Sequence, residues 1–99
     1  MRLTKEQAHI IRHTTQQRFG PDARVWLFGS RTDDNAKGGD IDLLIETPEP
    51  LENAFRESVG IETDLQIALG DQKIDILLLQ PDSQPSPIHQ IARKTGIEL

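Results

Sequence analysis

Three short apolar runs, residues 24–28, 40–46 and 73–79, most constrain how this chain can fold. Each is rich in Val, Ile, Leu, Phe or Trp, which is typical of buried strands. The segments around them have helical spacing, so we expect the order helix, strand, strand, helix, strand, helix. This order predicts an α/β (α+β) fold in which a small mixed sheet of three or four strands is flanked by helices. Trp26, inside the first run, is expected to lie in the core.

Capping residues predict where the first and last helices lie. Thr4 is a good N-cap for the first helix, which Gly20-Pro21 should end. Ser86-Pro87 should begin the last helix, because serine caps well and proline is favoured in a first turn. This last helix should run to Gly96.

The second helix is expected within residues 51–69, and its apolar stripe should face the core. The predicted stripe consists of Leu51, Phe55, Glu62, Leu65 and Leu69, with Val59, Ile61 and Ala68 beside it. Gly60 weakens the case for one continuous helix, since glycine costs about 1 kcal/mol relative to alanine.

Length and composition narrow the class of protein. The 99 residues fit one domain, residues 1–99, and the absence of cysteine excludes disulfides and thiolate metal sites. No apolar run approaches the ~18 residues of a membrane span, and the start lacks the apolar core of a signal peptide. We therefore expect a soluble cytoplasmic domain. Its net charge of −5 argues against a dedicated nucleic-acid binder, so no direct contact with nucleic acid is expected. Because no apolar run is long enough to span a membrane, no membrane contact is expected either.

The acidic residues Asp40, Asp42 and Asp75 carry the strongest chemical signal. Side chains alternate along a strand, so Asp40 and Asp42 should share one face, roughly 7 Å apart at ~3.3 Å per residue. Asp75 interrupts the apolar run 73–79, where an ionised carboxylate is costly unless it meets a cation or hydrogen-bond donors. If the second and third strands pair, the three carboxylates converge. Oxygen ligands of this kind favour Mg²⁺ or Mn²⁺ over zinc.

A turn at Gly29-Ser30 follows the first strand and supplies a second signal. Glycine lets the backbone approach a ligand closely, and a helix beginning here would offer free N–H groups to an anion. Taken alone, Gly-Ser is an ordinary turn, and it becomes informative because the carboxylates lie close behind it in the chain.

Two other metal sites are weaker readings of the sequence. A calcium loop starting at Asp33 fails, because Lys37 and Leu44 stand where an EF-hand needs oxygen ligands. His9 and His13 are four apart on the first helix, so zinc binding is geometrically possible, but a solvated helix face explains them more simply.

Gly29-Ser30, the spacer, Asp40-Ile41-Asp42 and the distant Asp75 together resemble the signature of the DNA polymerase β-like nucleotidyltransferase superfamily. Within it, the chain is most similar to the minimal nucleotidyltransferase (MNT) group, and the resemblance covers nearly its whole length. It implies a polymerase β-like fold. The chain departs from the pattern after Arg31, where Thr32-Asp33-Asp34 replaces the usual Ala-Arg-Gly and the spacer is one residue shorter than usual.

The resemblance also implies a role for each matching residue. Asp40, Asp42 and Asp75 would be catalytic and would hold two Mg²⁺ ions, or Mn²⁺, with ATP as substrate. Gly29, Ser30 and Arg31 would bind the nucleotide phosphates. The reaction would join AMP to an acceptor and release diphosphate.

The resemblance implies a partner as well. MNT proteins resemble antitoxins paired with HEPN-domain toxins, and the short chain leaves no residues for an acceptor domain of its own. We therefore expect a hetero-oligomer in which the chain adenylylates a HEPN toxin. A binding-only antitoxin is the main alternative, and a subunit of a small-molecule nucleotidyltransferase is a third.

Overall fold

The computed structural model describes residues 3–32, 40–84 and 86–99, and the predicted order of helices and strands is confirmed there. The elements are α1 (Lys5–Phe19), β1 (Arg24–Phe28), the short 3₁₀ helix η1 (Gly29–Thr32), β2 (Ile41–Glu46), α2 (Ala54–Leu69), β3 (Ile74–Leu79), α3 (Pro87–Thr95) and β4 (Ile97–Glu98). No helix in these described ranges is long and apolar enough to cross a membrane.

The sheet is mixed and has the strand order β3-β2-β1-β4 in the described part of the chain. β1 runs antiparallel to β2 and β4, whereas β2 and β3 are parallel and are joined through α2. The predicted fold class, a small α+β domain with a mixed sheet of three or four strands, is therefore confirmed. The fourth strand, which no apolar run marks, is β4 near the C-terminal end.

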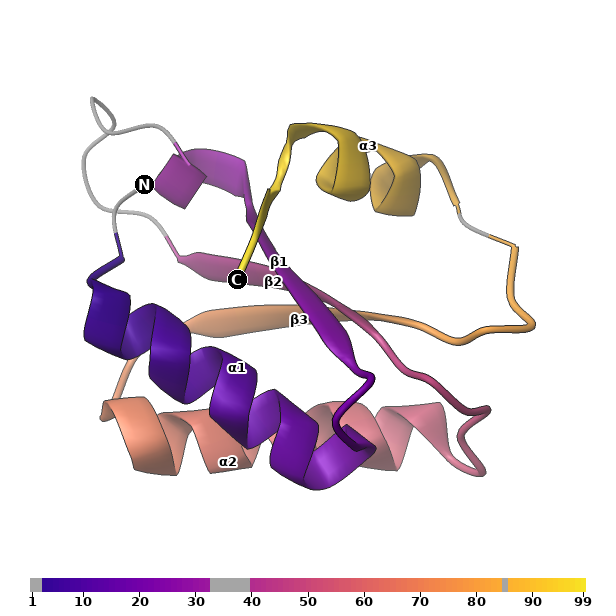
Figure 1. Ribbon diagram of the computed structural model, residues 1–99, viewed down its shortest axis with the longest axis horizontal. Coiled ribbons are helices and arrows are strands. Elements are labelled where there is room, and N and C mark those ends of the chain that lie inside the picture. The colour runs from indigo at the N-terminus through magenta and orange to yellow at the C-terminus, as the bar shows by residue number, and fades with distance from the viewer. Residues whose placement is uncertain (1–2, 33–39, 85) are drawn as a thin grey trace.

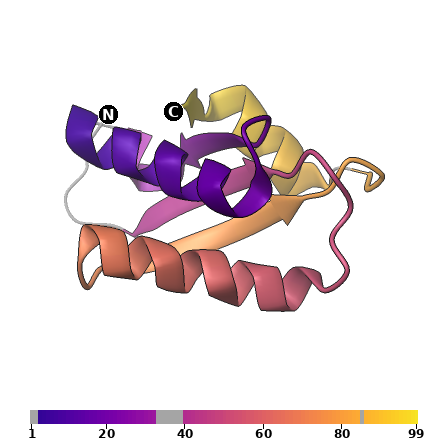
Figure 2. The ribbon, with the colours of Figure 1, turned by 60° about the horizontal axis from the view of Figure 1, so that its bottom comes forward.

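Helices cover the two faces of the sheet unequally. α1 and α2 lie side by side on one face, and the shorter α3 lies on the other (Figures 1 and 2). Alternate strand residues enter the two layers. The larger core, on the α1 and α2 side, contains Ile11, Val25, Leu27, Ile41, Leu43, Ile45, Ile61, Leu65 and Ile74. The smaller core, on the α3 side, contains Trp26, Leu44, Leu79 and Ala92.

Both predicted helix caps are confirmed by hydrogen bonds. The Thr4 hydroxyl accepts from the backbone N–H of Gln7 at 3.0 Å, and the Gln7 side chain accepts from the Thr4 N–H at 3.0 Å. At the start of α3, the Ser86 N–H donates to His89 Nδ1 at 3.0 Å, and Pro87 occupies the first turn. These side chains satisfy backbone donors that the helix itself leaves free.

The predicted stripe of the second helix is partly wrong. α2 begins at Ala54, so Leu51 precedes it, and its buried residues are Ile61 and Leu65. Phe55, placed in the stripe by sequence, is 81% exposed. At 100° per residue Phe55 lies about 120° around the helix from Ile61, and so it points to solvent.

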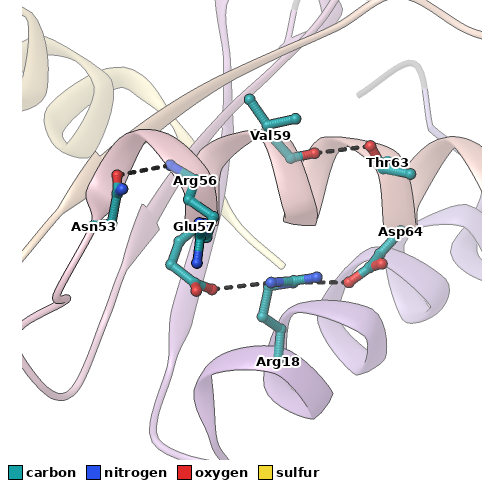
Figure 3. A network of polar contacts seen from close by, with 7 residues as sticks. All are labelled: Arg18, Asn53, Arg56, Glu57, Val59, Thr63 and Asp64. Atoms are coloured by element: carbon teal, nitrogen blue, oxygen red, sulfur yellow. Dashed lines mark hydrogen bonds and ion pairs between the residues drawn. The ribbon is translucent and has the colours of Figure 1, made fainter.

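Gly60 lies in a continuous helix, where its missing side chain makes room for a clamp between α1 and α2. Arg18 of α1 donates from Nε to Asp64 Oδ2 at 2.8 Å and from Nη1 to Glu57 Oε2 at 2.9 Å (Figure 3). A Cβ at position 60 would lie 2.6 Å from the Arg18 guanidinium. The glycine therefore lets the guanidinium lie against α2.

Candidate functional site

Asp42 and Asp75 are neighbours on the paired strands β2 and β3. The parallel register puts them directly opposite each other, which corresponds to about 4.8 Å between strand axes. Leu44, two residues after Asp42, belongs to the core on the α3 side, and Leu77, two residues after Asp75, packs against that core. By strand alternation both carboxylates lie on the α3 face of the sheet.

Gly29 closes over this pair at the end of β1. Its backbone has φ of +77°, and a Cβ built there would lie 2.3 Å from Asp42 Oδ2. Only a glycine fits both the left-handed backbone and the space beside this carboxylate. The Gly29-Ser30 turn thus lies against Asp42, and the proximity that the sequence suggested is present in the structure. Ser30 and Arg31 belong to the same short helix, η1.

Asp40 lies just before β2 and is held close to β3. The Ile41 N–H donates to the Lys73 carbonyl at 3.0 Å, which brings residues 40 and 73 together. Lys73 Nζ is 3.5 Å from Asp40 Oδ2, although three-quarters of the lysine side chain is exposed. Lys73 is a residue that sequence reasoning missed, since only the register of β2 and β3 places it beside the acids.

The electrostatic environment disfavours a charge on Asp42. Burial raises the pKa of the Asp42 carboxyl, and the negative charges of Asp75 and Asp40 raise it further, while Lys73 lowers it. Asp42 is half-buried and Asp75 is exposed. The expected cost of a carboxylate in the apolar run therefore falls on Asp42 rather than on Asp75, because Asp75 faces solvent.

The chemistry of this donor set suits a hard divalent cation. Three carboxylates provide only oxygen ligands, which Mg²⁺ and Mn²⁺ prefer, and a cation would offset the repulsion that raises the Asp42 pKa. Within residues 3–32, 40–84 and 86–99, however, no three His, Asp or Glu side chains form a ready metal-binding group. The residues fit the ion by type and position, and their side chains would have to close around it.

Part of the predicted site lies outside the described residues. The substituted positions Asp33 and Asp34, together with the rest of the spacer up to Gly39, fall in the range 33–39. His9 and His13 are described, and their rings lie 6.1 Å apart on an exposed face of α1. No third His, Asp or Glu joins them into a metal-binding group in the described part of the chain.

A second polar cluster lies at the opposite end of the α3 face. Arg93 Nε of α3 is 3.0 Å from Glu46 Oε1, an oxygen that has no well-aligned hydrogen bond. The guanidinium groups of Arg24 and Arg93 lie 4.7 and 5.8 Å from the ring centre of Trp26. Trp26 is buried, as expected. Arg93 thus helps to attach α3 to the sheet.

A cavity of about 410 Å³ opens beside this second cluster, and Arg24, Glu46 and Arg93 contribute to its lining. Glu46 in its lining is about 13 Å from Asp42 along β2, since the two residues are four positions apart at ~3.3 Å per residue. Of the two facing carboxylates, Asp75 is exposed and Asp42 is half-buried.

Comparison with protein families identifies the class of domain. The family model described as "Nucleotidyltransferase domain" matches residues 9–95, which is most of the chain. The chain therefore belongs to the nucleotidyltransferase domain family. No curated protein matches it significantly.

Membership in this family makes nucleotidyl transfer the general chemistry of the domain. The matched range includes β1, the Gly29-Ser30 turn, β2 and β3. It therefore contains all six residues that the sequence pointed to: Gly29, Ser30, Arg31, Asp40, Asp42 and Asp75.

Proposed function

We propose that this protein is a Mg²⁺-dependent nucleotidyltransferase that moves AMP from ATP onto a hydroxyl of a partner protein. The observation that carries the proposal is the position of Asp42 and Asp75 on adjacent strands, with Asp40 and the Gly29 turn beside them. Family membership supports the reaction type. The exposure of Asp75 supports a macromolecular acceptor, since a protein side chain can approach this carboxylate.

The three carboxylates would have distinct tasks in this reaction. Asp40 and Asp42 would hold two Mg²⁺ ions, which when bound neutralise charge on the attacking and leaving oxygens. The acceptor oxygen forms a bond to the α-phosphorus while the bond from that phosphorus to the β-phosphate oxygen breaks and diphosphate leaves. Asp75, which is more exposed than Asp42, would take up the proton of the acceptor hydroxyl.

Gly29, Ser30 and Arg31 would bind the triphosphate. They follow directly from the end of β1, and the η1 backbone lies against Asp42. A phosphate there would lie beside Asp42, one of the residues that would hold the ions. This arrangement supports in-line displacement, in which positioning and charge stabilisation provide most of the catalysis.

The partner we propose is a HEPN-domain toxin, which would make this protein the antitoxin of the pair. The acidic charge of the chain supports binding to a basic partner such as a ribonuclease, because complementary charge favours association. Adenylylation of a hydroxyl on the toxin would then neutralise it.

The decisive experiment incubates the protein with α-labelled ATP, Mg²⁺ and the protein encoded next to it. Label should appear on the neighbour, and the Asp40→Ala and Asp42→Ala variants should each reduce it at least about 100-fold. Asp71→Asn is the matched control, since Asp71 is an exposed acid in the bend before β3. Equal labelling by Asp42→Ala and the unchanged protein would refute the catalytic proposal.

A binding-only antitoxin is the second candidate, favoured by the substituted residues Asp33 and Asp34 after Arg31. It predicts a tight complex with the toxin that survives Asp40→Ala and Asp42→Ala, with no label transferred. The third candidate, a subunit of a small-molecule nucleotidyltransferase, predicts label on a small hydroxylated acceptor such as an aminoglycoside and none on the neighbour.

A further inference from the structure

The solvent face of α2 carries an apolar stripe that nothing in the nucleotidyl-transfer site uses. Phe55, Val59 and Ile67 are 81%, 47% and 80% exposed, and they are spaced four and eight residues apart. Thr63 completes the row at the position between Val59 and Ile67. Residues four apart on a helix form one continuous ridge. The stripe thus runs along α2 from its first turn to its last.

This ridge, residues 55, 59, 63 and 67, points away from the contacts that α2 makes inside the chain. Figure 3 shows Val59 and Thr63 on one side of α2 and Glu57 and Asp64 reaching from the other side to Arg18. α2 is therefore already fixed to α1 and to the sheet. Its ridge is a preformed surface, and binding there requires no rearrangement of the fold.

We propose that the ridge is the contact surface between two copies of this chain, which pair antiparallel through α2. The order along the ridge is large, small, small, large, so it matches itself when reversed. A two-fold axis level with residue 61 puts Phe55 of one copy beside Ile67 of the second copy, and Val59 beside Thr63. This is an isologous pairing, in which the same surface of each copy takes part.

Charges next to the ridge fit the same pairing. Arg56 is exposed beside Phe55, and in the reversed helix its level is that of residue 66, about 3 Å along the axis from Asp64. Asp64 accepts from Arg18 through Oδ2 and still has 38% of its side chain exposed. Each Arg56 is therefore nearly level with an Asp64 of the second copy, and the two-fold axis twice brings these opposite charges together on the α1 side of the helix pair.

The pair should be weak and concentration-dependent. One helix-on-helix contact covers on the order of half of the ~800 Å² that each partner buries in a standard interface. The two Glu62 side chains also come together on the other edge of the ridge, at levels about 3 Å apart. Like charges there oppose association.

Sedimentation equilibrium over a range from a few micromolar to several hundred micromolar protein tests the proposal. The unchanged chain should pass from monomer to dimer over this range. Phe55→Glu combined with Ile67→Glu should raise the dimer Kd at least about tenfold. Ile88→Glu combined with Ile91→Glu is the matched control, because these two α3 side chains are 52% and 59% exposed on the other face of the sheet. A chain that stays monomeric at every concentration overturns the proposal, as does a dimer lost only in the α3 variant.

Crosslinking tests the register separately, and the absence of cysteine from the chain makes introduced thiols unique. A mixture of Phe55→Cys chains and Ile67→Cys chains should form a covalent dimer with a short thiol crosslinker. Each variant alone should not, because two copies of position 55 lie about 18 Å apart along the axis in this pairing. Crosslinking of either variant alone as fast as the mixture would overturn the antiparallel arrangement. Neither test depends on nucleotide, metal or enzymatic activity.

Discussion

Gly29 combines a positive φ with a close approach to the Asp42 carboxylate. We expect Gly29→Ala to lower the free energy of unfolding by about 1–3 kcal/mol, the usual cost of holding a non-glycine residue at positive φ. It should also move the Asp42 carboxylate, since the new Cβ would occupy its space. Thermal unfolding and AMP transfer, measured together, check both effects.

Gly70→Ala separates the effect of backbone strain from the effect of displacing the Asp42 carboxylate. Gly70 also has positive φ, +92°, but a Cβ there would meet nothing within 4 Å. Its variant should show a similar loss of stability and unchanged transfer activity per folded molecule. If both variants retain activity, the Gly29 turn does not hold Asp42 in place.

Asp42 is a residue whose charge opposes folding at neutral pH. Burial and the neighbouring acids raise its pKa in the folded chain above the ordinary value of about 3.9. At a pH between the ordinary and the raised pKa, the folded chain holds a proton on Asp42 that the unfolded chain releases. The stability that this bound proton contributes is therefore lost as the pH rises through the raised pKa. At pH 7 without divalent cations, Asp42→Asn should therefore stabilise the protein, by up to about 1 kcal/mol at this half-exposed position.

Urea unfolding of Asp42→Asn and of the unchanged chain at pH 3.5 and pH 7 measures this effect. The stability difference should be small at the lower pH and larger at the higher one, whereas Asp71→Asn should change stability little at either. A destabilised Asp42→Asn at pH 7 would contradict the electrostatic account.

The sequence pointed to Asp40 and Asp42 because alternate residues share one face of a strand, and to Asp75 because a carboxylate that interrupts an apolar run is costly. It could not find Lys73 as a member of the group. The pairing of Lys73 with Asp40 depends on the register of two strands separated by a helix, and no local pattern encodes that register. His9 and His13 lie on an exposed face of α1, which agrees with the interpretation of these residues as part of a solvated helix face.

At the scale of elements, Gly60 within α2 and Gly96 just after α3 should respond differently to alanine. A Cβ at Gly96 would lie 2.3 Å from the Ala92 carbonyl oxygen and 2.9 Å from that of Leu27, and backbone atoms cannot easily move aside. Gly96→Ala should cost about 1–3 kcal/mol, as overpacking does, and should loosen α3 and β4 from β1.

Gly60→Ala is the contrasting case. Its Cβ would meet only the end of the flexible Arg18 side chain, and alanine gains up to about 1 kcal/mol in helix propensity. The loss of two solvent-exposed ion pairs offsets part of this gain. We expect a change in unfolding free energy below about 1 kcal/mol. Chemical denaturation of both variants measures the difference in unfolding free energy. An equal loss of stability at the two positions would show that the close backbone contacts at Gly96 do not make alanine more costly there.

Caps and apolar runs predicted most elements well, because both signals are local. The N-caps Thr4 and Ser86 and all three long strands lie where the sequence placed them. β4 was not predictable, since a two-residue strand forms only through its non-local pairing with β1. The solvent face of α2 was assigned wrongly because Phe55 and Val59 are apolar and yet unburied, so hydrophobicity alone misled the choice of face.

For the molecule as a whole, Mg²⁺ should act as a stabilising ligand. A ligand at tenfold excess over its Kd stabilises the native state by ~1.4 kcal/mol, and for a chain of this size ~1 kcal/mol shifts Tm by roughly 4–8 °C. Differential scanning calorimetry with increasing MgCl₂ should therefore show a rise of several degrees that EDTA reverses. The Asp42→Asn variant, already relieved of repulsion, should show little further rise. An equal response from both proteins would mean that the ion binds elsewhere.

Asp42 and Asp75 are 33 positions apart in the chain (75 − 42), and the whole of α2 separates the strands that bring them together. We expect parallel pairing across such a crossover to form late in folding, since a long loop must close before the contact forms. The repulsion between the carboxylates is thus absent while most of the chain assembles and arises when the last pairing is made. Its removal should slow unfolding far more than it speeds folding. The charge at this site therefore affects how long a folded molecule lasts, and has little effect on how quickly it is made.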